Sequence, residues 1–340
     1  MITLKELAAK CGVSIATVSN ILNGKANVSD KTKERIMKII KETGYRPNYM
    51  ARGLRAIRTR TLGLIVDDLT AFSTPSIIEG IMQYCDDNNY RVIFENLRVY
   101  TKFKGDKSLK QDFKNAVNAA FQEMLSIKVD GIIYVAAHSR IVDYIPKELP
   151  VPVVVSYALS SDKKHGSVTI ADEDAAYQMT DFLIQKGYKK IAVISGSSGN
   201  IHEENRINGY KKALEKNSLS YKSKYIIPAN WDRESGYEAA KKLPFNEIDA
   251  VFCFNDAMAA GVYDFLKEMG KAPGKDIGVA GFDNREISAY IDPPLTTMEI
   301  PLEEIGRISA DLIVKKINGT EEKSEEISVP CRLIIRKSIF

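Results

Sequence analysis

Cysteine is scarce in this sequence. The chain has four cysteines, Cys11, Cys85, Cys253 and Cys331. They are far apart and form no Cys-x-x-Cys pair, which argues against a disulfide framework or a zinc site and favours a reducing compartment. Long apolar runs are missing too, because no stretch approaches the ~18 consecutive apolar residues of a membrane span. Since the first residues also lack the basic-then-apolar order of a secretory signal, we expect a cytoplasmic protein with no membrane segment.

Histidine is almost as scarce, which limits metal and acid–base chemistry. His138, His165 and His202 are scattered and match neither an HExxH motif nor a metal triad. Residues 195–199 are rich in glycine and serine and follow an expected strand, as a phosphate-binding loop would. They match neither GxGxxG nor the P-loop pattern, so a glycine-rich turn before a helix is the commoner explanation. We therefore predict no metal, no cofactor and no enzymatic activity.

Basic residues are present in quantity but are unevenly distributed. Residues 1–60 hold 13 of the 48 Lys and Arg residues and only four of the 44 acidic residues, so this segment carries a net charge of +9. The remaining residues carry a net charge of −5. A basic head on a mildly acidic body suggests that the head meets a polyanion. A solvated, charged helix surface is the alternative reading of the charge alone.

Three short helices are expected within residues 1–45. Thr3 and Glu6 form a capping box, and an apolar i, i+3, i+4, i+7 repeat makes the first helix amphipathic up to Cys11. Gly12 ends this helix, and Ser14 caps a second that runs to about residue 22. A third helix starts at Ser29 and buries isoleucines at positions 36, 39 and 40. Two short helices joined by a tight glycine-containing turn form a helix-turn-helix pattern.

The second helix has two unlike faces. At ~100° per residue, Val18, Ile21 and Leu22 point toward the first helix. The opposite face carries small and amide side chains, namely Ala16, Ser19, Asn20 and Asn23, with Ile15 at its edge. Asn can bond adenine through two hydrogen bonds, and Ile or Ala can touch a thymine methyl group. The alternative is a helical hairpin with a polar outer face, which would not explain the segment that follows.

Residues 46–60 predict a hinge helix and linker. Pro47 suits the first position of a helix, and Met50, Ala51 and Leu54 form one apolar stripe. Arginines flank this stripe at positions 52, 55, 58 and 60. A helix of about two turns is marginal in water, so it would order only against a partner, and its basic flanks favour DNA.

Residues 61–340 alternate short β-rich runs with helical stretches. The first runs are residues 62–66, 91–94, 131–135 and 151–155, and a second series comprises 167–170, 191–194, 225–227, 250–254 and 277–280. Continuous apolar strands between helices indicate parallel sheets covered on both faces. We predict two doubly wound subdomains with a ligand cleft between them. The first would hold about residues 61–158 and 299–326, and the second about residues 159–298 and 327–340.

Short motifs along nearly the whole chain resemble the lactose-repressor family of bacterial transcription regulators. In the head and hinge these are residues 4–8, 12–14, 17–19 and 22–24 and Tyr45-x-Pro47-Asn48-x-x-Ala51-Arg52-x-Leu54. In the body they are residues 204–210, Phe254-Asn255-Asp256-x-x-Ala259, Gly281-Phe282-Asp283 and Pro293-Pro294-Leu295-Thr296-Thr297. The resemblance implies a small all-α helix-turn-helix domain plus an α/β effector domain that is similar to periplasmic sugar-binding proteins.

The same resemblance implies the residues that contact DNA. Ile15, Ala16 and Asn20 would read bases, although the family usually has Arg where this chain has Asn20. Phosphates would be touched by Ser14, Thr17, Asn23, Ser29 and Thr32. The hinge would enter the minor groove with Asn48, Ala51, Leu54 and Arg55, and Leu54 would wedge into the central base step. A homodimer would bind a pseudo-palindromic operator in double-stranded DNA.

In the body, the resemblance implies a site for a sugar or sugar derivative. The candidate residues are Phe72, Ser73, Tyr157, Arg206, Trp231, Asn255 and Asp283. Asp accepts hydrogen bonds from paired hydroxyls, while Arg and Asn donate to ligand oxygens. Trp231 could stack on a pyranose or could anchor a hydrophobic core, and both interpretations stay open.

These observations together predict a repressor of carbohydrate-utilisation genes whose operator affinity a bound effector controls. The alternatives are a sugar-binding protein or an α/β enzyme with an accessory basic head. Neither accounts for the helix-turn-helix and the hinge together. RNA binding is disfavoured because the head lacks aromatic side chains placed for base stacking.

Overall fold

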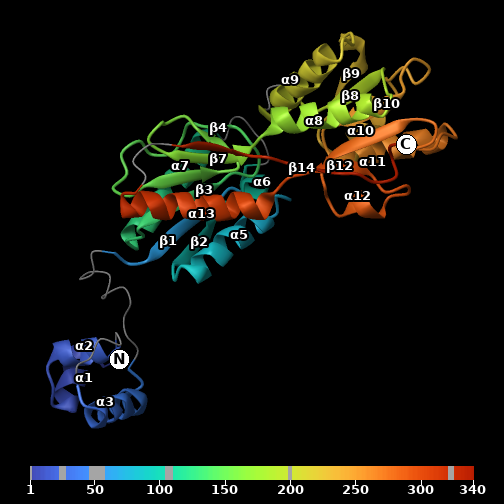
Figure 1. Ribbon diagram of the computed structural model, residues 1–340. Helices are drawn as coiled ribbons and strands as arrows, with labels where there is room; N and C mark the ends of the chain where they lie inside the picture. Colours follow the sequence, from blue (N-terminus) through green and yellow to red (C-terminus); the bar gives the residue numbers. More distant parts are fainter. Residues whose placement is uncertain (1, 23–27, 46–57, 104–109, 198–200, 321–324) are drawn as a thin grey trace. The chain divides into compact units, whose positions relative to one another are not determined.

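The computed structural model describes residues 2–22, 28–45, 58–103, 110–197, 201–320 and 325–340. The chain forms two compact units, Met1–Thr59 and Arg60–Phe340. Figure 1 shows the first unit as helices alone and the second as helices around two sheets. Among the described residues, no helix is long and apolar enough to cross a membrane.

Three helices make up the described part of the first unit: α1 (Leu4–Cys11), α2 (Ile15–Leu22) and α3 (Asp30–Thr43). The predicted capping box is confirmed, because the Thr3 hydroxyl accepts from the Glu6 amide at 3.2 Å and the Glu6 carboxylate accepts from the Thr3 amide at 2.8 Å. Gly12 ends α1 in the left-handed region at φ 62°, where glycine meets no steric penalty. A small core of buried side chains joins the helices: Leu7, Ala8, Cys11, Val18, Ile21 and Ile36.

The second unit holds two six-stranded sheets. The first has the order β13-β7-β5-β3-β1-β2 and is parallel throughout. Its strands are β1 (Thr61–Val66), β2 (Arg91–Asn96), β3 (Gly131–Val135), β5 (Val153–Ser156), β7 (Gly166–Ile170) and β13 (Glu326–Val329). Strands β4 (Ile141–Val142) and β6 (Leu159–Ser160) form a separate small pair.

The second sheet has the order β14-β12-β11-β10-β8-β9, in which only β14 is antiparallel to its neighbour. Its strands are β8 (Ile191–Ser195), β9 (Ile226–Pro228), β10 (Ala250–Cys253), β11 (Gly278–Asp283), β12 (Thr296–Glu299) and β14 (Arg332–Ile334). A 3-10 turn, η2 (Ser223–Tyr225), precedes β9, so the strand begins one residue later than the predicted run.

Helices cover both faces of the first sheet, which explains why its inner strands β1, β3, β5 and β7 are buried along almost their whole length. Leu64 packs in one core cluster with Ile77 of α5 (Thr74–Asp87), whereas the next residue, Ile65, packs in another with Phe121 of α7 (Lys110–Ser126). Helix α13 (Leu302–Asn318) lies beside α5 (Figure 1). The two backbones approach so closely that a Cβ at Gly80 would lie 1.9 Å from a carbonyl oxygen of α13. We call this sheet and its helices the first half, to which the short α6 (Val99–Lys102) also belongs.

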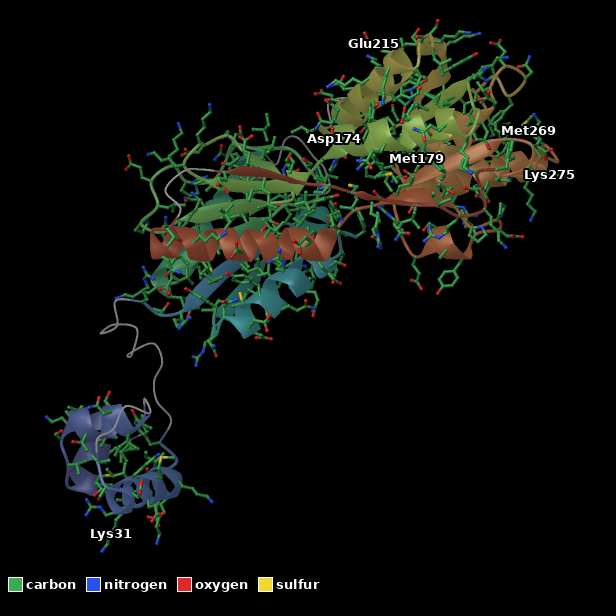
Figure 2. The ribbon with its side chains drawn as sticks, viewed as in Figure 1. Lys31, Asp174, Met179, Glu215, Met269 and Lys275 are labelled. Carbon is green, nitrogen blue, oxygen red and sulfur yellow. The ribbon has the colours of Figure 1, made fainter. Side chains whose placement is uncertain are left out.

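The second half contains the second sheet and its helices. These are α8 (Asp172–Gln185), α9 (Ile201–Lys216), α10 (Arg233–Ala240), α11 (Asp256–Glu268) and α12 (Ile287–Tyr290). Helices α8 and α9 pack against each other, as do α10 and α11. Met179 of α8 is fully buried in this layer, whereas the nearby Asp174 is exposed (Figure 2).

The chain crosses between the halves three times, and two of the crossings correct the predicted boundaries. Strand β7 pairs with β5, so the first half extends to Ile170 and not to residue 158. Strand β13 pairs with β7, so the last crossing follows Val329 and not residue 326. The middle crossing lies between Glu299 and Leu302. Sequence pattern could not assign these two strands, because short parallel strands look alike whichever sheet they join.

Candidate DNA-contacting face and effector site

Helix α2 presents the three predicted base-reading residues to solvent. Ile15, Ala16 and Asn20 are exposed, and Ile15 is 36% exposed although it is a large apolar residue. On the opposite side Val18 and Ile21 are buried against α1 and α3. The predicted division of the helix into an inward and an outward face is confirmed for these residues.

Four predicted phosphate-contacting residues form two hydroxyl pairs at helix starts. The Ser14 and Thr17 hydroxyls lie 2.9 Å apart at the first turn of α2, and those of Ser29 and Thr32 lie 2.9 Å apart at the first turn of α3. Each serine oxygen also accepts from the backbone amide of its threonine, at 3.1 Å and 3.4 Å. Helix N-termini carry unpaired amides and a partial positive charge, which favour anions.

Lys31, in the first turn of α3 next to the Ser29–Thr32 pair, is exposed (Figure 2). Five of the residues predicted to contact DNA lie outside the described residues: Asn23, Asn48, Ala51, Leu54 and Arg55.

In the body, a buried ion pair organises the predicted effector residues of the second half. Arg206 on α9 is 2% exposed, and its Nε donates to Asp172 Oδ1 at 2.7 Å. The guanidinium carbon lies 3.5 Å from the ring centroid of Phe282 and 5.9 Å from that of Trp231, and Nη1 donates to the Phe254 carbonyl. One buried cation therefore touches the ends of β10 and β11 and the loop after β9.

His202 connects this ion pair to the first half. Its Nδ1 lies 2.6 Å from Asp172 Oδ2, and its Nε2 accepts from the backbone amide of Ser139, beyond β3, at 3.2 Å. Since Nε2 accepts, Nδ1 carries a proton and donates to Asp172. Burial alone would raise the pKa of Asp172, but His202 and Arg206 lower it, so the carboxylate stays ionised. The ring of Tyr157 lies 5.5 Å from His202.

A second contact between the halves involves the predicted residues Asp283 and Phe72. Asp283 ends β11 and accepts from Arg285 Nε at 3.0 Å. The same guanidinium lies 4.1 Å from the ring centroid of Phe72, in the loop after β1, at cation–π distance. Arg285 thus contacts both a carboxylate of the second half and an aromatic ring of the first.

Asn255 and Trp231 occupy neighbouring loops of the second half. Asn255 caps α11 by accepting from the Met258 amide at 2.8 Å, and its Nδ2 donates to the Trp231 carbonyl at 2.8 Å. Trp231 is partly buried against the main core. Ser73 is fully buried at the start of α5, where its hydroxyl donates to the Ala137 carbonyl at 3.4 Å.

Three of the seven predicted effector residues have strained backbones. Tyr157, Trp231 and Asp283 have φ angles of 63°, 68° and 105°. Non-glycine residues in this region cost on the order of 1–3 kcal/mol each, and they persist where surrounding contacts hold them. Such strain concentrates at ligand sites, which supports the grouping of these residues.

Sequence reasoning missed four residues that hold this site together: Asp172, His202, Asp256 and Arg285. Asp172 is the first residue of α8, and an acidic residue at that position indicates only the start of a helix. His202 matches no metal or catalytic motif in the sequence, yet its side chain is buried, at 6% exposed. No spacing rule pairs Asp172 with His202, because they become neighbours only when α8 and α9 pack.

Asp256 is a fully buried acid behind the site. Its Oδ1 accepts from the Thr297 hydroxyl at 2.6 Å and its Oδ2 from the Arg285 amide at 2.6 Å. Burial, followed by the nearby Asp283 carboxylate, raises the pKa of Asp256 from 3.8 to about 8. Burial also raises the pKa of Asp283, although Arg206 and Arg285 oppose this rise.

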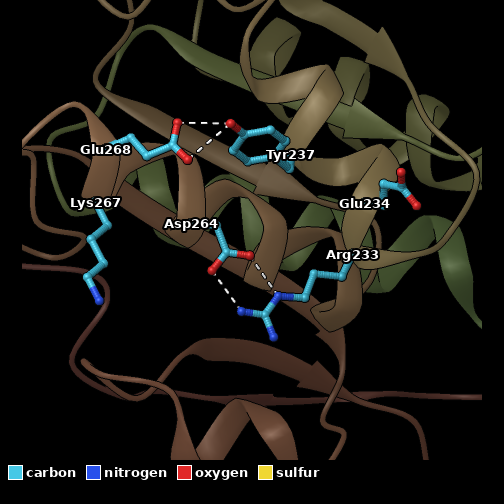
Figure 3. Close-up of a pocket in the computed structure, with 6 residues that line it drawn as sticks. All are labelled: Arg233, Glu234, Tyr237, Asp264, Lys267 and Glu268. Carbon is cyan, nitrogen blue, oxygen red and sulfur yellow. Dashed lines mark hydrogen bonds and ion pairs between the residues drawn. The ribbon is translucent and has the colours of Figure 1, made fainter.

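Two hollows differ in their relation to these residues. One, on α10 and α11, is lined by groups that pair with each other: Arg233 with Asp264, and Tyr237 with Glu268 (Figure 3). None of the seven predicted effector residues lines it. The other is lined by Asp283 of the second half together with residues of α5 and α13. That hollow therefore lies between the halves, next to a predicted effector residue.

We predict that Asp256→Asn flattens the pH dependence of stability. Because the folded-state pKa of Asp256 lies above its ordinary value of 3.8, its stabilising contribution is complete below about pH 4 and is lost as the pH rises through about 8. An amide does not titrate, and it can keep both partners when its oxygen accepts from the Arg285 amide and its NH2 group donates to the Thr297 hydroxyl. The melting temperatures of variant and wild type should be measured between about pH 5 and pH 8.5. The difference, variant minus wild type, should increase as the pH rises. Asp174→Asn, an exposed control on α8, should show the same change of melting temperature with pH as the wild type. If the melting temperature of Asp256→Asn also changes with pH as that of the wild type does, the prediction is wrong.

Comparison with known proteins agrees with this arrangement. Residues 3–48 match the family model "Bacterial regulatory proteins, lacI family", and residues 180–339 match "Periplasmic binding protein-like domain". The chain is 32% identical to catabolite control protein A of Priestia megaterium, with 99% of both chains covered. It is 29% identical to the ribose operon repressor of Haemophilus influenzae, covering 100% of this chain and 99% of the relative.

Solved structures give the same result. A transcriptional regulator CelR–cellobiose complex matches with a TM-score of 0.68 and 25% identity, over 99% of this chain and 100% of the other. The Lac repressor dimer bound to operator and the anti-inducer ONPF matches with a TM-score of 0.80 and 24% identity, over 99% and 98%. The helix-turn-helix, the two parallel-sheet halves and these full-length matches lead to one conclusion: the chain belongs to the lacI family of bacterial regulatory proteins and is a DNA-binding transcription regulator with an effector-controlled domain.

Proposed function

We propose that this protein is a repressor of carbohydrate-utilisation genes that acts as a cytoplasmic homodimer and has no catalytic activity. Residues 1–45 would be the DNA-binding headpiece, residues 46–60 the hinge helix and linker, and the rest the effector domain. A neutral sugar or sugar derivative would bind between the halves of the body and change operator affinity. The observation that carries this proposal is the buried Arg206–Asp172–His202 group, which joins the predicted sugar-binding residues to Ser139 of the first half.

On the DNA side, we propose that Ile15, Ala16 and Asn20 read base edges from the major groove, because they are exposed on one helix. The paired hydroxyls at the starts of α2 and α3 would touch phosphates, together with Asn23. The hinge residues Asn48, Ala51, Leu54 and Arg55 would enter the minor groove. A dimer would bring two such heads to a pseudo-palindromic operator.

On the effector side, the chemistry of the site favours an uncharged, hydroxyl-rich compound. The Arg206 cation is already paired with Asp172, and Arg285 is paired with Asp283, so neither charge calls for an anionic ligand. Asp283 can accept from paired hydroxyls, and the aromatic rings of Phe72, Tyr157 and Trp231 can cover apolar sugar faces. Cellobiose is named with a similar regulator, and ribose with a regulator of Enterococcus faecium.

The proposed mechanism is a two-state change in the angle between the halves. The Ser139–His202 and Phe72–Arg285 contacts join the halves and end on residues that neighbour the effector site. A sugar that bonds Asp283 competes with Arg285 for that carboxylate and so alters one of the two contacts. The first half would then move relative to its dimer mate, and the hinge helices would separate or approach. By linkage, DNA must change effector affinity by the same factor.

We predict that Asn20→Ala selectively weakens binding to the specific operator. Loss of one bidentate hydrogen bond to a base costs about 1–3 kcal/mol of binding free energy, or roughly 5- to 150-fold in affinity. Titrations with the natural upstream DNA and with a scrambled duplex at one salt concentration would measure this loss. Met37→Ala, which removes an exposed side chain from α3, is the matched control and should change neither affinity. An equal loss on both duplexes would show that Asn20 does not read sequence.

We also predict that one compound in a panel of sugars and sugar acids changes operator affinity of the purified full chain. The same compound should have no effect on Asp283→Asn, because the substitution removes one of the two oxygens that accept from paired hydroxyls. The remaining oxygen can still accept from Arg285 Nε, so the DNA affinity of the variant without a sugar should stay within about twofold of the wild type. Operator titrations of both proteins with each compound test this directly. If Asp283→Asn responds with the wild-type dose dependence, the proposed site is wrong. If no compound acts, the effector is not a sugar.

A further inference from the structure

Asp67 is a buried acid outside the predicted effector residues. It follows the apolar strand β1 and is 1% exposed. Its Oδ1 accepts from the Tyr134 hydroxyl of β3, and its Oδ2 accepts from the Ala137 amide at 2.8 Å and from Arg140 Nη2 at 2.5 Å. A carboxylate at this depth requires a cation and hydrogen-bond donors, and it obtains both from β3 and the loop that follows β3. One side chain therefore joins the carboxyl ends of two neighbouring strands.

Arg140 extends this group around Ser139. Its Nη1 donates to the His138 carbonyl at 3.2 Å. Because Asp67 also holds the Ala137 amide, hydrogen bonds fix the backbone directly before Ser139 and the side chain directly after it. The loop between β3 and β4 contains no helix or strand, so these bonds set the direction of its amides.

The direction of one of these amides decides a contact between the halves. The Ser139 amide donates to His202 Nε2 at 3.2 Å, and Ser139 is 2% exposed. A hydrogen bond weakens steeply once its donor angle departs far from linear, so a rotated amide at Ser139 would release His202. Asp67 is also the first residue after β1, in the loop that carries Phe72, and Phe72 contacts Arg285 of the second half. Both contacts described between the halves therefore start from loops that meet at Asp67.

We propose that the Asp67–Arg140 pair is a positioning group that controls how strongly sugar binding and operator binding affect each other. By holding the Ser139 amide toward His202, the pair transmits a change at the effector site to the first half. The inference rests on the proposed function, because the coupling of sugar to operator is part of it. It goes beyond that function by assigning the coupling to two residues outside the predicted DNA-contacting and effector residues.

Arg140→Met tests the proposal, because it keeps an unbranched side chain and removes every donor. Operator titrations of the full chain, with and without the panel sugar that changes operator affinity, give the coupling factor of wild type and variant. The variant should lose about half of the coupling free energy, since one of the two contacts described between the halves is released. Asp67→Asn/Arg140→Met removes the charge together with its cation, so no unpaired charge stays buried, and it should show the same loss.

A second readout needs no sugar. The chain has three histidines, so labelling with ¹⁵N-histidine gives few ring signals, and His202→Phe identifies those of His202. Loss of the hydrogen bond from Ser139 should move the Nε2 signal of His202 downfield in Arg140→Met. A merely structural role of Arg140 would lower the melting temperature and leave this signal in place.

Lys212→Met is the matched control. It removes the cation of an exposed ion pair with Glu173 from α9, the helix that carries His202, and should keep the wild-type coupling factor and Nε2 signal. A folded Arg140→Met or double variant with the full coupling factor, or with an unmoved Nε2 signal, would overturn this inference alone. A wild-type chain whose operator affinity no panel sugar changes would overturn the proposed function and this inference with it.

Discussion

The buried ion pair between Arg206 and Asp172 is the interaction on which the rest of the body depends. Both side chains are almost completely withdrawn from water, where an unpaired charge is strongly destabilising, so each requires the other. The pair fixes Arg206 against Phe282 and presents Asp172 to His202, which continues to the Ser139 amide of the other half. The proposed effector residues and the Ser139–His202 contact between the halves therefore share one electrostatic group.

This sharing gives the proposed regulation a physical basis. The charged groups of the site are already paired with each other, so an incoming sugar that bonds to them replaces or extends existing contacts. Arg285 shows the consequence, since it contacts both Asp283 and Phe72. A ligand with different affinities for the two arrangements of the halves shifts their equilibrium by that difference and no more.

Much of the fold was predictable from the sequence, and the reasons are local. The capping box at Thr3, the glycine at position 12 and the outward face of α2 follow from short-range chemistry, and the structure confirms them. The strands of the body were expected because their sequences are short, continuous apolar runs between helical stretches. Such runs are typical of strands in sheets that are covered on both faces. The sheet joined by β7 and β13 was not predictable, nor was the meeting of Asp172 with His202, because long-range packing decides both. The strained φ of Trp231 likewise has no counterpart in sequence pattern.

The central claim is that sugar and operator binding are coupled through the His202 link. The most direct test measures sugar affinity with and without operator DNA, in the wild type and in His202→Phe, which keeps a ring beside Tyr157 but loses both hydrogen bonds. In the wild type, operator should change sugar affinity by the factor by which sugar changes operator affinity. In the variant, that factor should fall toward one while the sugar still binds. A variant that binds sugar and keeps the full wild-type factor would contradict the account.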